Sequence, residues 1–145
     1  MTEENCLFCR IVSGELSAVI VFADKDSLAF LDHRPLFPGH TLLVPREHYE
    51  TLTDLPAAHV GPLFQNAQTL ARAVESAMEA EGTFVAMNNR VSQSVPHLHI
   101  HIVPRRRKDG LKGFFWPRTK YKTPEEMAVV QQKIAAALKE NNSRK

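Results

Sequence analysis

One seven-residue stretch alternates imidazole and aliphatic side chains: His97-Leu98-His99-Ile100-His101-Ile102-Val103. Successive side chains of a strand point to opposite faces, so the three histidines share one face and the aliphatic residues between them share the other. Histidines two positions apart are then roughly 6–7 Å apart, close enough to act on one substrate or one metal ion. We therefore predict a strand over 97–103 with one face in the core and one face that carries chemistry.

The segments around this stretch predict an α+β domain spanning residues 1–145. Short runs rich in β-formers predict further strands over 18–23, 27–31, 41–44 and 83–87. A short helix is expected over 6–13 and is ended by Gly14. The architecture expected is a five-stranded antiparallel sheet with one long helix packed on it and a C-terminal helix.

The two longer helices have sequence signals of their own. The long helix should begin at Pro56 and be capped by Gly82. The last should begin in a capping box at 123–126 and run to about Lys139, followed by a frayed charged tail. Apolar residues at three- and four-residue steps form the predicted core face of the long helix: Val60, Leu63, Phe64, Ala67, Leu70, Ala71, Val74 and Met78.

Composition and charge exclude several classes of protein. The chain has no apolar run long enough to span a membrane, and its acidic start lacks the apolar core of a secretory signal, so a cytoplasmic location is expected. Between Pro104 and Lys122, eight lysines and arginines are opposed by Asp109 alone, a cluster that attracts anions or forms a solvated loop. The aromatic residues 114–116 inside it could stack on bases, but we favour a hydrophobic plug in a subunit interface.

Cys6 and Cys9 form a CxxC pair near the start of the chain. Two cysteines cannot make a disulfide framework, and by themselves these could be a redox pair, half of a zinc site or a coincidence. A thioredoxin-like pair should follow the first strand, whereas this one precedes every predicted strand. A zinc site would require two further ligands.

Three histidines on one face fit either of two chemistries. One is a metal site with an open position for water; the other is covalent catalysis by an imidazole nucleophile. The loop before the histidines holds neutral polar side chains suited to phosphate oxygens, and it has no carboxylate to act as base for a metal-bound water. These loop residues, Asn88, Asn89, Gln93 and Ser94, favour a histidine that attacks phosphorus.

The alternation at 97–103 resembles the signature of the histidine triad family of nucleotide hydrolases and transferases. The resemblance covers most of the chain, because further family landmarks follow in family order: Cys6–Arg10, Phe30–Asp32, Pro38-Gly39-His40, Pro45–His48 and Gln93–Arg105. It is strongest in the triad with its upstream Gln-Ser-Val. Ser92 stands where the family usually has glycine.

The resemblance implies a nucleotide hydrolase acting on a purine nucleoside phosphoramidate or a dinucleoside polyphosphate. His99 would attack the α-phosphorus to form a nucleotidyl-histidine, which water then hydrolyses to a nucleoside monophosphate. An unperturbed imidazole is mostly neutral near pH 7 and is therefore a competent nucleophile. His101 would contact the phosphate or the leaving group, and Ser94 would stabilise charge that develops on the oxygens.

The remaining binding residues are also implied by the resemblance. Asp32 would accept from the ribose hydroxyls, Gln93 would belong to the nucleotide site, and either Asn88 or Asn89 would reach the phosphate. Three apolar residues match family positions that line the base pocket: Phe8, Leu16 and Phe30. The leaving-group side is expected to come from the segment 105–118.

Some family members bind a structural zinc, and the matching ligands here would be Cys6, Cys9, His48 and His97. A Cys₂His₂ set makes a closed tetrahedral site that ties a segment to the sheet. The family habit also implies a homodimer with a continuous ten-stranded sheet. A role in binding nucleic acid is not expected. The competing reading is a nucleotide-binding regulatory protein with weak residual hydrolase activity.

Overall fold

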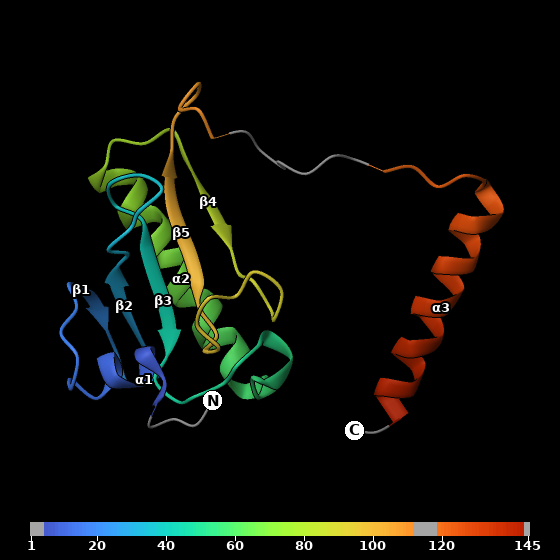
Figure 1. Ribbon diagram of the computed structural model, residues 1–145, viewed down its shortest axis with the longest axis horizontal. Helices are drawn as coiled ribbons and strands as arrows, with labels where there is room; N and C mark the ends of the chain where they lie inside the picture. The colour runs from blue at the N-terminus through green and yellow to red at the C-terminus, as the bar shows by residue number, and fades with distance from the viewer. Residues whose placement is uncertain (1–4, 112–118, 144–145) are drawn as a thin grey trace. The chain divides into compact units, whose positions relative to one another are not determined.

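The computed structural model describes residues 5–111 and 119–143, and the chain divides into two compact units, Met1–Asp109 and Gly110–Lys145 (Figure 1). The elements of the first unit follow the order α1 (Leu7–Val12), β1 (Ile20–Ala23), β2 (Ser27–Leu31), β3 (Thr41–Pro45), a 3₁₀ turn (Leu52–Asp54), α2 (Ala57–Ala77), β4 (Gly82–Ala86) and β5 (Ile100–Arg105). The second unit contains α3 (Pro124–Ser143). In the part of the chain that the structure describes, no helix is both long and apolar enough to cross a membrane.

The five strands form one antiparallel sheet, which confirms the prediction, and the structure adds their order, β1-β2-β3-β5-β4. The predicted strand over 97–103 begins late, because β5 starts at Ile100. The backbone ahead of it bonds elsewhere: the His97 amide donates to the Val95 carbonyl in a turn, and the Leu98 amide donates to the Tyr49 carbonyl at 2.6 Å. Only His101 of the three histidines therefore lies in the sheet ladder.

The two faces of the sheet carry separate clusters of buried side chains, and this confirms the predicted alternation. Leu98, Ile100 and Ile102 are fully buried in the cluster that includes Leu63 and Ala67 of α2. Burial of each such aliphatic side chain contributes about 2 kcal/mol, which anchors the histidine-bearing strand. The opposite cluster belongs to the α1 side of the sheet: Cys6, Phe8, Leu28, Phe30, Leu42 and Val44.

The long helix begins where predicted but ends earlier. Pro56 is its N-cap, and the last helical residue is Ala77. Glu79 then adopts a positive φ of 51°, while the Ala80 amide donates to the Glu75 carbonyl and closes the helix end. The prediction that Gly82 caps this helix is wrong, because Gly82 is the first residue of β4.

The apolar stripe of α2 is narrower than predicted. Phe64 is 41% exposed, so it is not a core residue of this chain. The other predicted members of the stripe are buried or packed against the core. Apolar residues at three- and four-residue steps define a broad face of α2, and the sheet covers only part of that face.

In the second unit, α3 confirms half of the predicted capping box. The Thr123 hydroxyl accepts from the Glu126 amide at 3.1 Å, but the Glu126 carboxylate accepts from the Lys122 amide rather than from that of Thr123. The helix continues past the predicted end at Lys139 to Ser143. The predicted aromatic plug at 114–116 lies outside the described residues.

Candidate active site

His99 is held as a buried, oriented imidazole. It is 4% exposed, and its Nδ1 lies 2.7 Å from the backbone carbonyl of His97. A carbonyl only accepts, so Nδ1 carries the proton and Nε2 carries the free lone pair. Phe8 packs edge-on against the ring at 5.1 Å, and burial lowers the pKa of His99. The side chain is therefore neutral near pH 7, with a nucleophilic nitrogen of fixed identity.

His101 is held in the opposite tautomer by a chain of two hydrogen bonds. The Leu36 amide donates to His40 Nδ1 at 3.1 Å, so the proton of a neutral His40 is on Nε2. His40 Nε2 lies 3.0 Å from His101 Nδ1 and donates to it. His101 therefore carries its own proton on Nε2. Burial, with smaller contributions from His99 and His40, lowers the pKa of His101 to about 4.

Asp32 stands at the edge of this histidine cluster. Its carboxylate accepts from the Arg34 amide at 2.8 Å and lies 3.8 Å from His40 Nε2. The Asp32 amide also donates to the His40 carbonyl, so the loop between these residues is closed on itself. The carboxylate is thereby fixed where the strand β2 ends.

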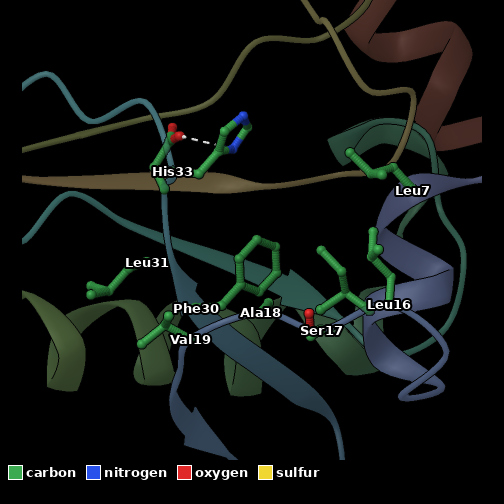
Figure 2. Close-up of a pocket in the computed structure, with 10 residues that line it drawn as sticks. Leu7, Leu16, Ser17, Ala18, Val19, Phe30, Leu31 and His33 are labelled. Atoms are coloured by element: carbon green, nitrogen blue, oxygen red, sulfur yellow. Dashed lines mark ion pairs between the residues drawn. The ribbon is translucent and has the colours of Figure 1, made fainter.

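A hollow of about 730 Å³ lies beside Asp32, within the size range of small-molecule sites. Two of the residues expected to contact the base, Leu16 and Phe30, line it, and Figure 2 shows them with Leu7 around a common space. The third, Phe8, packs between Phe30 and His99. Leu7 and Ile11, one helical turn apart on α1, take the lining position, and the sequence analysis missed both.

The polar side chains before the triad differ in whether they already hold the backbone of another segment. Asn89 accepts the Leu52 amide at 2.8 Å, and Gln93 bonds through both ends of its amide, to the Glu50 carbonyl and the Arg90 amide. These two residues tie the loop to the segment after β3. Asn88 is exposed, with a long 3.2 Å bond to the Ser92 carbonyl. Ser94 is exposed as well.

Four possible metal ligands converge at the start of the histidine stretch 97–103. The donor atoms of Cys6, Cys9, His48 and His97 lie within 4.8 Å of one another. His97 Nε2 donates to the Pro45 carbonyl at 2.9 Å, which leaves its Nδ1 lone pair toward the two thiols, each 3.5 Å away. His48 Nδ1 lies 3.2 Å from Cys9 Sγ. A carbonyl bound to the far nitrogen of a histidine is the usual support of a metal ligand, so the donor set fits zinc.

A second group, Asp32, His40 and His101, is equally compact. It does not fit a metal, because the Leu36 amide occupies the lone pair of His40 and leaves a proton on the nitrogen that would have to bind. The two clusters therefore differ in chemistry. The Cys₂His₂ cluster directs lone pairs toward a common centre, whereas in the second cluster one hydrogen bond determines which nitrogen of the next imidazole is protonated.

The arginines that begin the basic segment lie in the first unit, at the end of β5. Arg105 pairs with Asp109 at 2.6 Å at the far end of β5, about 13 Å along the strand from His101 by the rise per residue. Arg105, Arg106 and Arg107 line a separate hollow with Glu81. The expectation that the segment 105–118 builds the leaving-group side stays a prediction. Residues 112–118 lie outside the described residues.

The HIT domain family matches residues 13–108, which include the whole triad. The chain belongs to the HIT family. Adenosine 5'-monophosphoramidase hnt1 of Schizosaccharomyces pombe is 34% identical over 93% of this HIT protein and 99% of its own length. A HIT protein from Bacillus subtilis shares 32% identity, with a TM-score of 0.82 over 91% of this chain and 96% of its own.

A third similar protein bears on the metal ligands. The structure of a zinc-bound histidine triad protein from Mycobacterium smegmatis has a TM-score of 0.72 and 35% identity, covering 99% of this chain and all of its own.

Proposed function

We propose that this HIT protein cleaves a purine nucleoside phosphoramidate or dinucleoside polyphosphate at the α-phosphate through a nucleotidyl-His99 intermediate. The observation that carries the proposal is the His99 Nδ1 bond to the His97 carbonyl, because it leaves Nε2 as the nucleophile. Membership in the HIT family and a relative named as an adenosine monophosphoramidase support nucleotide hydrolysis in general.

The first half of the proposed reaction forms one bond and breaks one. The lone pair of His99 Nε2 attacks the α-phosphorus, and the bond from phosphorus to the leaving nitrogen or oxygen breaks. His101 carries its proton on Nε2 and can donate a hydrogen bond from it to the leaving group, which takes up its own proton from solvent. Water then attacks phosphorus, the bond to His99 breaks and the nucleoside monophosphate leaves.

The rest of the substrate would be held by residues of the hollow and the loop. Asp32 accepts from the ribose hydroxyls, and Leu16 and Phe30 contact the base. Asn88 and Ser94 donate to the phosphate oxygens; Asn88 is preferred to Asn89, whose side chain holds the Leu52 amide. Gln93 acts by fixing the loop rather than by touching the nucleotide.

We also propose that Cys6, Cys9, His48 and His97 hold a structural zinc ion. The metal would supply a closed tetrahedral tie between α1 and the catalytic stretch, with no open position for substrate. The homodimer and the cytoplasmic location stay predictions. β4 is an edge strand with Val85 44% exposed, which supports pairing with a second copy, and light scattering after size exclusion would test it.

The test is turnover of adenosine 5'-phosphoramidate and of a diadenosine polyphosphate by the purified protein, with release of AMP as the readout. His99→Ala should abolish turnover and retain AMP binding, whereas the matched substitution His59→Ala on α2 should keep both. An active His99→Ala variant would refute the covalent route. Tight AMP binding by a wild-type protein that turns over neither substrate would indicate the regulatory alternative.

A further inference from the structure

The two thiols of this chain lie in one cluster but are unequally accessible. Cys6, the N-cap of α1, is fully buried, whereas Cys9 is only partly buried. Cys9 also lines a hollow of about 660 Å³ together with His48 and Tyr49. A small solute in this hollow can reach the sulfur of Cys9 before that of Cys6.

The geometry of the pair suits a disulfide. Both sulfurs lie 3.5 Å from His97 Nδ1, and the donor atoms of the cluster all fall within 4.8 Å of one another. Cys6 is the N-cap of α1, and its carbonyl accepts the first hydrogen bond of the helix, from the Arg10 amide. This bond places Cys6 about one turn from Cys9, with Cα atoms about 5 Å apart, inside the range that a disulfide spans.

The same two sulfurs supply half of the donor set for the metal. A disulfide removes both thiolates at once, and the two remaining imidazoles of His48 and His97 cannot complete a tetrahedral site. Metal binding and disulfide formation are therefore mutually exclusive states of one cluster.

We propose that Cys6 and Cys9 form a reversible oxidation site at which hydrogen peroxide expels the bound zinc. The Cys9 thiolate attacks the peroxide, so the O–O bond breaks, sulfur is oxidised to the sulfenic acid and one water leaves after protonation by solvent. The Cys6 thiolate attacks this sulfur, the S–O bond breaks, and a second water leaves with the Cys6–Cys9 disulfide. Zn²⁺ departs unchanged in oxidation state.

Oxidation at this site would act on the catalytic stretch through His97. The His97 side chain belongs to the metal cluster, while its backbone carbonyl holds the proton-bearing nitrogen of His99. Loss of the metal removes the bond at His97 Nδ1, while Nε2 stays bonded to the Pro45 carbonyl.

The main experiment treats the zinc-loaded full-length protein with hydrogen peroxide. Zinc release is followed with a chromogenic chelator, thiols are titrated after denaturation, and intact mass is measured. We expect two thiols to be lost for each zinc released, a mass lower by two hydrogen atoms, and recovery of both thiols and zinc on addition of dithiothreitol and Zn²⁺. Because Cys6 and Cys9 are the only cysteines of the chain, an intrachain disulfide is unambiguous.

Three results of this experiment would overturn the proposal. They are zinc that stays bound while peroxide is consumed by other residues, added oxygen atoms in place of lost hydrogens, and a disulfide between two chains on a non-reducing gel. A rate of disulfide formation that does not fall as Zn²⁺ is raised would overturn the competition between metal and disulfide.

A pair of matched variants tests which sulfur reacts first. In Cys6→Ser, the remaining Cys9 should form a sulfenic acid that dimedone traps; in Cys9→Ser, the buried Cys6 should not be labelled. Circular dichroism reports whether each variant is folded, and the wild-type mass shift decides the question if either is not. Equal labelling of the two folded variants would contradict the assigned order. None of these readouts depends on nucleotide turnover, so failure of the proposed hydrolase function would leave them unaffected.

Discussion

Replacement of His101 by glutamine should make the free energy of unfolding depend less on pH between pH 6.5 and 4. In the folded protein burial holds the pKa of His101 at about 4, compared with 6.5 for the exposed side chain. As the pH falls, the unfolded chain binds a proton at this residue first, so the unfolded state gains stability relative to the folded state. The contribution of neutral His101 is fully present above pH 6.5 and is lost progressively down to about pH 4.

The interval between these two pKa values corresponds to about 3 kcal/mol of unfolding free energy. His40 shares a hydrogen bond with His101, and the pKa of His40 is also lowered, mainly by burial. The free energy of about 3 kcal/mol therefore describes the coupled titration of both histidines. His99 and Asp32 are the other titratable groups that act on His101, with opposite signs. His101→Gln removes the titrating group and keeps a polar side chain.

The assay is urea unfolding of both proteins at a series of pH values from 8 to 4, with the difference in unfolding free energy plotted against pH. Protonation of carboxylates and loss of zinc occur in both proteins and cancel in this difference. We expect the unfolding free energy of the wild type, relative to that of His101→Gln, to fall by about 3 kcal/mol between pH 6.5 and 4. His59→Gln, outside the cluster, is the matched control. Parallel curves for wild type and His101→Gln would refute the assignment of a buried neutral imidazole.

Three further predictions concern the metal and two loop positions. Elemental analysis should find about one zinc per chain, absent from the Cys6→Ala/Cys9→Ala variant; equal metal in both would exclude these ligands. Gly39→Ala should lower the unfolding free energy by about 2 kcal/mol, because φ of Gly39 is 97° and an added Cβ would lie 2.6 Å from Met78 Cγ. An unchanged midpoint of urea unfolding would contradict this prediction. Ser92→Gly should raise stability by about 1 kcal/mol, since φ is 59° at this residue; a destabilised variant would show that the serine side chain contributes more than its backbone strain costs.

The histidine stretch illustrates how far a local pattern determines structure. Alternation alone correctly placed Leu98, Ile100 and Ile102 in the core, because side chains of an extended segment must alternate whatever they contact. It could not predict that the ladder begins at Ile100. That boundary depends on where β3 ends and on the Tyr49 carbonyl, which is distant in the chain.

The limits of the other helix and pocket predictions have the same origin. Glycine is a common helix cap, but here Gly82 pairs with Arg105 in the sheet, and Glu79 adopts the left-handed conformation after the helix. Phe8 of α1 packs between Phe30 and His99, while Leu7 and Ile11 of the same helix line the hollow. A pattern on one helix does not specify which turn faces a hollow and which faces the sheet.

The sequence determines which chemical groups come together, and the tertiary structure determines their protonation state and orientation. The sequence by itself determined that three imidazoles share one face, that two thiols stand three residues apart, and which residues to compare with a known family. Only the tertiary structure decided which nitrogen of each ring carries the proton, because the deciding partners are backbone groups: the carbonyls of His97 and Pro45 and the amide of Leu36. Backbone donors and acceptors are the same in every residue, so only the fold determines which of them meets which ring.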